Sequence, residues 1–373
     1  MVHAPDITAC FSEDYSQARR RFLFACEAVG AKVRAYANPA RGPRAEELAA
    51  DVAWIGPDDA RFVLVTISAT HGVEGFCGSA VQTDWLTHGG GGRLPDGIAA
   101  LFIHAINPHG FAWIRRVNED GVDLNRNHID FSRPLPANPG YDELADALVP
   151  REIAGPVLQA AAAKLAAFRA KHGERAYRLA RNGGQYTHPG GHCYGGTKPT
   201  WSRLTIEATI ADCALAGRDA VAVIDFHTGL GPFGYGEPIC DHAPNTLAAR
   251  RARAWYGDSV TSSTLGTSSS PPLTGHGRDT WVRALGERVA FITLEFGTYS
   301  LDHGLSALRG DYWLHGRGTV DWDAPETRRI KAGIRKHFFP DTEDWKEMVL
   351  FRSRQILRQA QAGLAQIGDV LLE

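Results

Sequence analysis

Short apolar runs bounded by turn residues are the feature that most constrains how this chain can fold. They occupy residues 33–37, 52–56, 62–67, 99–107, 220–227 and 288–296. Uninterrupted apolar runs of this length are typical of strands that are covered on both faces. Stretches with a helical pattern lie between them, for example at 78–87 and 200–216. This alternation predicts an α/β fold with helices on both faces of the sheet.

Two further helices are predicted near the ends of the sequence. At 12–30, Ser12 can cap a helix whose apolar residues recur at helical spacing until Gly30. Residues 340–366 form an amphipathic pattern with an acidic start, which predicts a long helix packed on the sheet.

Residues 133–219 differ from the segments on either side of them. An alanine-rich helical stretch is followed by a loop at 182–202 that is rich in glycine and aromatic residues. The segment separates two strands that otherwise look like neighbours, so we interpret it as an insertion that could cover a site. An excursion with a purely structural role is the alternative.

Charge and hydropathy exclude several classes of protein. The 373 residues include 40 Lys+Arg against 42 Asp+Glu, a net charge of -2, which argues against nucleic-acid binding through a basic face. No apolar run approaches the roughly 18 residues that a membrane span needs, and the first residues show no secretory signal. The six cysteines are scattered without a CxxC pair, which is typical of a reduced protein. We therefore expect a cytoplasmic protein that binds neither nucleic acid nor membranes.

Ionisable residues follow the predicted strands at the points where α/β folds place their active sites. His71 and Glu74 follow one run, His227 ends another, and Glu295 lies near the end of the last. A His and a Glu three residues apart face the same side of a helical turn, and both side chains are suitable zinc ligands. His227 can supply a third ligand. Taken alone, the first pair is also consistent with a His–Glu contact that stabilises a turn.

A second segment strengthens the metal hypothesis. It contains an NPHG sequence at 107–110, then Arg115 and Arg116, then GVDLNRN at 121–127. With the preceding HxxE, a strand ending in a His and a late strand bearing a Glu, this order resembles the zinc carboxypeptidase superfamily (the M14 metallopeptidases), including its uncharacterised bacterial branch. The resemblance spans roughly residues 60–300 and leaves the insertion and both termini outside it.

The resemblance has consequences for fold and domain organisation. It implies a three-layer α/β/α fold with a twisted, mostly parallel mixed sheet. Because the ligands come from both sides of the insertion, we expect residues 1–373 to form one catalytic domain with an insertion at about 133–219.

The resemblance also assigns roles to site residues. It implies that Zn2+ is bound by His71, Glu74 and His227. Glu295 matches the catalytic Glu, which takes a proton from the attacking water and later gives it to the leaving nitrogen. Arg116 matches the cation that stabilises the developing oxyanion. Arg115 is its neighbour, but successive residues point apart, so we favour Arg116.

Three residues of the 121–127 motif complete the expected site. Asn125 and Arg126 match the pair that holds a substrate carboxylate, and Asp123 resembles a residue that accepts a hydrogen bond from a ligating His. Carboxypeptidases of this superfamily usually have a mobile Tyr between the third ligand and the catalytic Glu, and no tyrosine of this chain has that late position. Tyr194, in the insertion, is our candidate to line the substrate site instead.

The sequence therefore predicts a zinc-dependent hydrolase that cleaves an amide bond next to a substrate carboxylate, acting as a carboxypeptidase on peptides. The missing Tyr keeps a second version open, an N-acyl-amino-acid deacylase of the aspartoacylase or succinylglutamate desuccinylase kind, with a small acyl-amino acid as substrate. A metal-binding protein without catalysis is a third. A cysteine hydrolase that uses Cys77 is a fourth, because a thiolate can be stabilised at a helix N-terminus.

Overall fold

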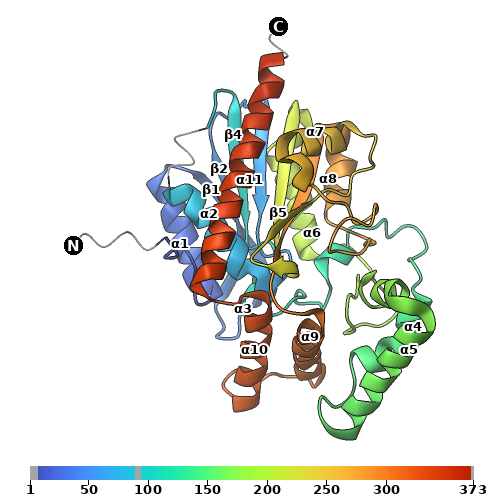
Figure 1. The fold of residues 1–373 in the computed structure, drawn as a ribbon. Helices are drawn as coiled ribbons and strands as arrows, with labels where there is room; N and C mark the ends of the chain where they lie inside the picture. The colour runs from blue at the N-terminus through green and yellow to red at the C-terminus, as the bar shows by residue number, and fades with distance from the viewer. Residues whose placement is uncertain (1–6, 89–93, 371–373) are drawn as a thin grey trace.

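The computed structural model describes residues 7–88 and 94–370 and contains a seven-stranded sheet with the order β1-β2-β4-β3-β5-β7-β6 (Figure 1). The strands are β1 (Lys32–Arg41), β2 (Glu47–Ile55), β3 (Phe62–Ile67), β4 (Ile98–His104), β5 (Ala220–Phe233), β6 (Gly236–Ile239) and β7 (Val289–Gly297). The pairs β4–β3, β3–β5 and β5–β7 are parallel, and the pairs towards both edges are antiparallel. The predicted mixed sheet is confirmed.

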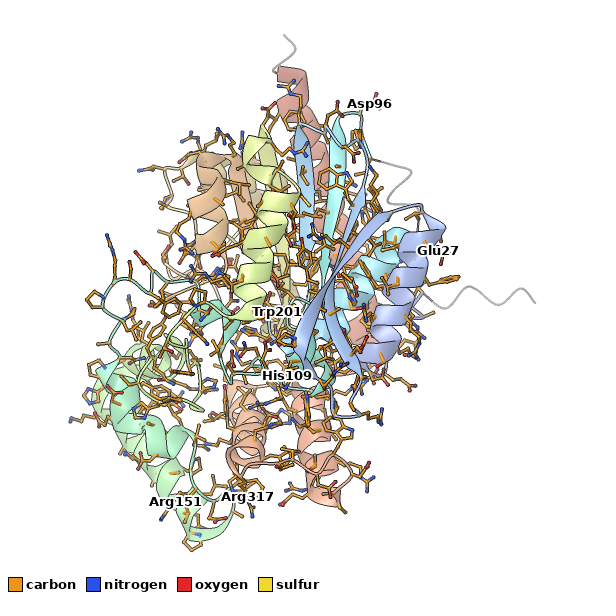
Figure 2. All side chains as sticks on the ribbon, turned by 180° about the vertical axis from the view of Figure 1, so that it is seen from behind. Glu27, Asp96, His109, Arg151, Trp201 and Arg317 are labelled. Atoms are coloured by element: carbon orange, nitrogen blue, oxygen red, sulfur yellow. The ribbon has the colours of Figure 1, made fainter. Side chains whose placement is uncertain are left out.

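A layer of helices covers each face of this sheet, and further helices lie beyond its lower end (Figure 1). The helices are α1 (Tyr15–Ala28), α2 (Gly75–Thr87), α3 (Pro108–Ala112), α4 (Pro139–Leu148), α5 (Gly155–Asn182), α6 (Trp201–Asp212), α7 (Leu247–Tyr256), α8 (Arg278–Leu285), α9 (Leu301–Gly316), α10 (Pro325–Phe338) and α11 (Glu343–Val370). One core contains residues of α1, α2, α7 and α11, and the other contains residues of α6 and α8. Figure 2 shows α6 from behind, with Trp201 in its first turn. The predicted three-layer α/β/α fold is therefore confirmed. Among the described residues, no helix combines the length and the apolar character that a membrane crossing requires.

Two local predictions are wrong for identifiable reasons. The run 33–37 is not covered on both faces, because β1 is the edge strand and most of its residues are exposed. Ser12 does not cap α1. The helix begins one residue after Asp14, whose carboxylate accepts a hydrogen bond from the main-chain N–H of Gln17 at 2.7 Å.

The insertion has two structurally different parts. Helices α4 and α5 pack on each other around a small core of their own and lie beside the lower end of the sheet (Figure 1). Helix α6 instead packs its Ile206 and Ile210 against the sheet, as part of the second layer. The segment that departs from the three-layer body therefore ends before Trp201.

Candidate metal centre and its cavity

The site lies at the carboxyl ends of the parallel strands, where two segments of the chain are fixed against each other. After β3 the chain forms a short turn, Gly72–Glu74, that leads into α2. The turn lies directly on α3: a Cβ atom on Gly72 would be 1.9 Å from the carbonyl carbon of Gly110. The main-chain N–H of Val73 also donates to the carbonyl of Arg115 at 2.8 Å. Glycine at both contact points thus allows the HxxE turn to touch the segment that carries Arg115 and Arg116.

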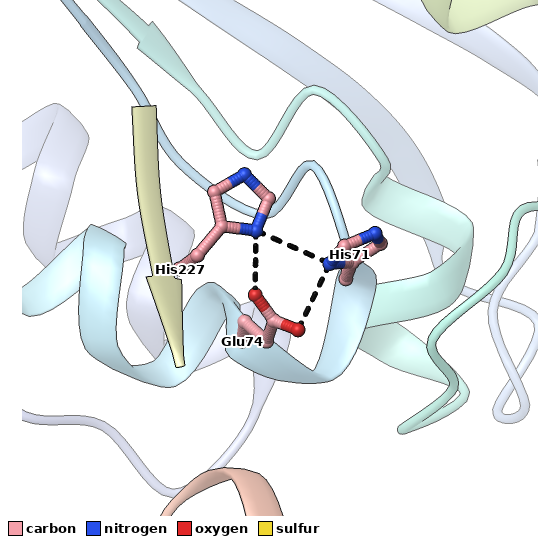
Figure 3. Close-up of side chains that lie close together, drawn as sticks. All are labelled: His71, Glu74 and His227. Atoms are coloured by element: carbon pink, nitrogen blue, oxygen red, sulfur yellow. Dashed lines mark hydrogen bonds and ion pairs between the residues drawn. The ribbon is translucent and has the colours of Figure 1, made fainter. Parts of the chain in front are cut away.

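Three buried side chains converge at this point (Figure 3). Glu74 reaches His71 Nδ1 through Oε1 and His227 Nδ1 through Oε2, both at 2.9 Å. The two Nδ1 atoms lie 3.2 Å apart, and one ligand atom from each residue falls within 4.8 Å of the others. Two imidazole nitrogens and one carboxylate are the ligand set of a catalytic zinc site.

The hydrogen-bond partner of Nε2 in each imidazole determines whether its Nδ1 can bind a metal. Asp123 lies 3.1 Å from His71 Nε2, and Asp225 lies 2.9 Å from His227 Nε2. A carboxylate accepts hydrogen bonds, so each Nε2 carries its proton, and in the neutral ring Nδ1 then presents a lone pair. Two lone pairs and a carboxylate that face one another repel unless a cation or a proton lies between them. This donor set therefore fits a metal ion.

The charges of these three side chains reflect the same geometry. Burial disfavours the charged form of His227, but Asp225 and Glu74 outweigh it and raise the pKa of His227 well above its ordinary value. Burial likewise disfavours the Glu74 carboxylate, but His71 and His227 hold the pKa of Glu74 below its ordinary value. The cluster thus favours positive charge at the position where the ligand atoms meet.

Glu295 lies directly beside the ligand set. His227 of β5 and Glu295 of β7 are paired in the parallel register, and Glu295 Oε1 accepts a hydrogen bond from the main-chain N–H of Leu230 at 3.0 Å. Burial, together with the Glu74 carboxylate, raises the pKa of Glu295 to about 8. A carboxyl group that titrates near neutrality can both accept and donate a proton.

Arg115 and Arg116 point to different surroundings. Arg116 Nε donates to Asp123 Oδ2 at 3.0 Å, and its Nη1 lies 3.5 Å from Glu74 Oε1. Arg115 Nε donates to Asp311 Oδ2 at 3.0 Å, outside the site. The predicted divergence of these neighbours is present in the structure.

A cavity that is partly open to solvent gathers most of the predicted residues. Those that line it are His71, Glu74, Arg116, Asn125, Arg126, His227 and Glu295. Asp123 is not in the lining, because it lies behind His71 and Arg116. The insertion closes part of the wall with Arg181, Asn182, His192 and Cys193.

Asn125 and Arg126 are already engaged by the chain. Asn125 Oδ1 accepts from the main-chain N–H of Gly277 at 3.0 Å, and its Nδ2 lies 3.3 Å from His227 Nε2. Arg126 donates from Nε and Nη2 to the carbonyl of Asn182, at 3.1 and 2.6 Å. Their predicted role in binding a substrate carboxylate stays a prediction, and Arg126 has little free donor capacity for it.

Tyr194 does not line the cavity. The chain has a left-handed conformation at Cys193, with φ 55°, and Cys193 rather than Tyr194 forms part of the wall. Tyr194 contributes its main-chain carbonyl, which accepts from the N–H of Asp123 at 2.8 Å. No tyrosine of the described residues lines this cavity.

The sequence interpretation missed two residues, Asp225 and Arg181. Asp225 had a readable signal, because it lies two residues before His227 on one strand and so faces the same side. Arg181 had none, since only the packing of the insertion brings it to the cavity.

The cysteine alternative does not fit the geometry. Cys77 is 1% exposed, in the first turn of α2. Burial, with Glu74 and Glu295 nearby, raises the pKa of the Cys77 thiol well above its ordinary value. It also does not line the cavity, so it cannot act as an exposed thiolate there.

Comparison with known sequences gives a family without an assigned activity. A family model described as a protein of unknown function, DUF2817, matches residues 11–352. A comparison with curated proteins finds no significant match.

Comparison with solved structures identifies the fold. Carboxypeptidase A from Helicoverpa armigera aligns with a TM-score of 0.50 at 13% identity, over 94% of this chain and 74% of that one. Bovine thrombin-activatable fibrinolysis inhibitor aligns with a TM-score of 0.44 at 12% identity, over 93% and 97%. An aspartoacylase family protein from Mesorhizobium loti aligns with a TM-score of 0.36 at 17% identity, over 79% and 69%. At these identities the first likeness establishes the carboxypeptidase fold and nothing finer.

Proposed function

The chain belongs to the DUF2817 family, and we propose that it is a zinc-dependent hydrolase that cleaves an amide bond next to a substrate carboxylate. One observation carries the proposal: the convergence of His71, Glu74 and His227, with Glu295 beside them in the same cavity. The ligands come from both sides of the 133–219 insertion, which supports one catalytic domain.

The metal-binding part of the site rests on the ligand residues and the groups behind them. His71, Glu74 and His227 would hold the ion, and Asp123 and Asp225 keep the two imidazoles in the tautomer that metal binding needs. When bound, zinc lowers the pKa of water and polarises a carbonyl oxygen.

The remaining steps belong to residues of the chain. Glu295 takes the proton of the attacking water and passes it to the leaving nitrogen, a transfer suited to a carboxylate that lies beside the ligand set. Arg116 donates hydrogen bonds to the oxyanion that develops on the substrate carbonyl. Asp123 orients Arg116 through its contact with Nε, so the guanidinium is in place before the substrate arrives.

Carboxypeptidase-like cleavage of peptides is the first version of this activity, and hydrolysis of small N-acyl-amino acids is the second. The second is favoured by the absence of a tyrosine from the cavity wall among the described residues. The insertion also contributes residues to the cavity wall, which suits a small substrate. Both substrates present an amide bond and a carboxylate.

Assays on the full chain test the proposal. Purified protein loaded with zinc is incubated with a panel of peptides and a panel of N-acyl-amino acids, and released amino acids are quantified. We expect release from at least one panel, loss of it with a chelator and recovery with added zinc. Turnover that survives metal removal, or no release from either panel, contradicts the proposal. Release from acyl-amino acids alone selects the deacylase version.

A further inference from the structure

The guanidinium of Arg126 cannot hold a carboxylate through two parallel hydrogen bonds. Its Nε and Nη2 both donate to the carbonyl of Asn182, its Nη1 donates to the carbonyl of Asn125 at 2.8 Å, and Nη2 also lies 3.7 Å from Cys193 Sγ. Bidentate binding needs two adjacent free N–H groups on one edge of the fork. Neither edge offers such a pair.

The insertion is built closely onto Arg126, so this arrangement is a fixed part of the fold. Gly184 has φ +109°, and a Cβ atom there would lie 2.8 Å from Arg126 Cδ. Both the conformation and the space require glycine at this position. The loop that starts at Asn182 therefore holds the Arg126 side chain in place, and we interpret the role of Arg126 as structural.

Arg181, one residue before Asn182, differs from Arg126 because most of its hydrogen-bond donors have no partner among the described residues. It lies in the last turn of α5, lines the same cavity and is 6% exposed. Its Nε has no hydrogen-bond partner, and its Nη2 makes one long contact, 3.4 Å, with the carbonyl of Leu301. Within the described part of the chain no carboxylate oxygen lies within 4.0 Å of it. A buried cation without a counter-charge is costly, so its retention in a cavity wall points to a ligand.

The polar side chains around Arg181 do not pair with its charge. His192 lines the cavity here, and its Nδ1 is a second buried polar atom without a partner. Burial and the charge of Arg181 hold the pKa of His192 well below its ordinary value, so the ring is neutral. The nearby cation Arg309 donates to main-chain carbonyls only. Asp241, a carboxylate in the wall, is engaged by the hydroxyls of Ser262 and Ser263.

We propose that Arg181, rather than Arg126, is the residue that binds the carboxylate of the substrate. The inference rests on the proposed function, because it names the group that recognises the amino-acid part of a peptide or acyl-amino acid. This inference gives the insertion a function. It occupies the hydrogen-bond donors of Arg126, and it places the guanidinium of Arg181 at the cavity wall. The ligand it fits is a carboxylate that enters the cavity together with the amide bond to be cleaved.

Calorimetric titration of the full, zinc-loaded chain carrying Glu295→Gln separates this inference from the hydrolysis itself. The probe is N-acetylglycine, and N-acetylglycinamide is the neutral control. We expect tighter binding of the acid, and Arg181→Met weakens it about tenfold or more, because a hydrogen bond to a charged group contributes about 1.5–3 kcal/mol. Binding of the amide stays unchanged.

Arg309→Met is the matched control, since it removes a partly buried arginine without a carboxylate partner that does not line the cavity. It should leave the affinity for N-acetylglycine within about twofold. Arg181→Gln keeps a polar but shorter and uncharged side chain, and the same loss is expected there if the Met variant does not fold. Both Arg181 variants should unfold at the same or a higher temperature, because they remove an unpaired buried charge.

Two results would overturn the inference. One is an Arg181 variant that folds and binds N-acetylglycine as tightly as its parent. The other is a parent that binds the acid and the amide equally. Either result leaves the hydrolysis assays with peptides and acyl-amino acids untouched, so failure here and failure of the proposed function are distinguishable.

Discussion

Arg115 and Arg116 are neighbours in sequence, yet they belong to two buried charge clusters of different character. Arg115 joins Asp311 and Lys331, where Asp311 accepts from Arg115 Nε at 3.0 Å and from Lys331 Nζ at 2.6 Å. Arg116 joins the cavity, where two imidazole lone pairs face one carboxylate. In the first cluster two cations share one carboxylate, whereas in the second the lone pairs of two imidazoles and a carboxylate face one another. Buried charge alone is therefore a poor sign of function, and convergent donors without a partner are a better one.

We expect the largest difference in turnover between substitutions of two glutamates on adjacent strands. Glu295 of β7 and Glu237 of β6 are cross-strand partners, but Glu237 is engaged by Thr261 and Ser269 and does not line the cavity. We expect Glu295→Gln to lower turnover of an identified substrate about 100- to 10,000-fold, because it removes the proton acceptor. Initial rates at saturating zinc measure the effect.

Glu237→Gln is the control for that substitution. It keeps the shape of a buried glutamate one strand away, so turnover should change little even if the thermal midpoint falls. Equal loss of activity in both variants would show that burial, and not the position beside the ligands, sets the effect.

The second contrast concerns stability. Arg115→Met leaves Asp311 paired with Lys331, and loss of a hydrogen bond to a buried charged group costs about 1.5–3 kcal/mol. Urea unfolding measures this loss, and zinc affinity should stay unchanged. Arg116→Met should instead lower turnover about 100-fold, since it removes a donor to the oxyanion. A stable Arg115→Met protein with impaired hydrolysis would invert the assignment of the two clusters.

The fold was predictable because the strands that position the site are apolar along most of their length. In β3, β4 and β7 every residue is buried, so the sequence carries a strong pattern. Strand β6, with the sequence GEPI, has no such pattern and forms because β7 offers it an edge. Its existence depends on a tertiary neighbour and is invisible to local periodicity.

The candidate site was predictable to the extent that it follows strand ends. His71, Glu74, His227 and Glu295 are found in this way, and the structure brings them together. Arg181 is not, because its position depends on how α5 and the following loop pack against Arg126. A sequence pattern assigns residue types to strand ends, but it does not show which donors the rest of the chain has already used.

A third and smaller effect concerns zinc affinity and the carboxylate that contacts a metal ligand from its far side. Asp225→Asn keeps the shape beside His227 but removes the charge that holds the Nε2 proton. Loss of such a partner typically lowers metal affinity about 10- to 100-fold. Competition with a chromophoric chelator measures zinc affinity, and Thr70→Val, which removes only a donor to Asp225, should have a smaller effect. Equal affinity in Asp225→Asn and the parent would mean that the tautomer is set in another way.

The smallest expected effect is the pH dependence of the paired cluster. Burial disfavours the Asp311 carboxylate, but Lys331 and Arg115, with His315 nearby, outweigh it and hold the pKa of Asp311 below its ordinary value. Because the pKa is depressed in the folded state, this carboxylate stabilises the fold above its unfolded pKa, and the contribution is lost as pH falls below about 4.

Asp311→Asn removes that titration and should flatten the acid limb of the unfolding free energy by at most about 1.4 kcal/mol per pH unit, the value for one proton. Urea unfolding between about pH 2.5 and 6 measures the slope in both proteins. Asp58→Asn is the control, because Asp58 forms an exposed pair with Lys32 and contributes little to stability. An unchanged slope in Asp311→Asn would mean that pairing of charges does not stabilise this cluster. The Asp311 cluster and the metal centre would then differ in how their side chains pack and not in how their charges are paired.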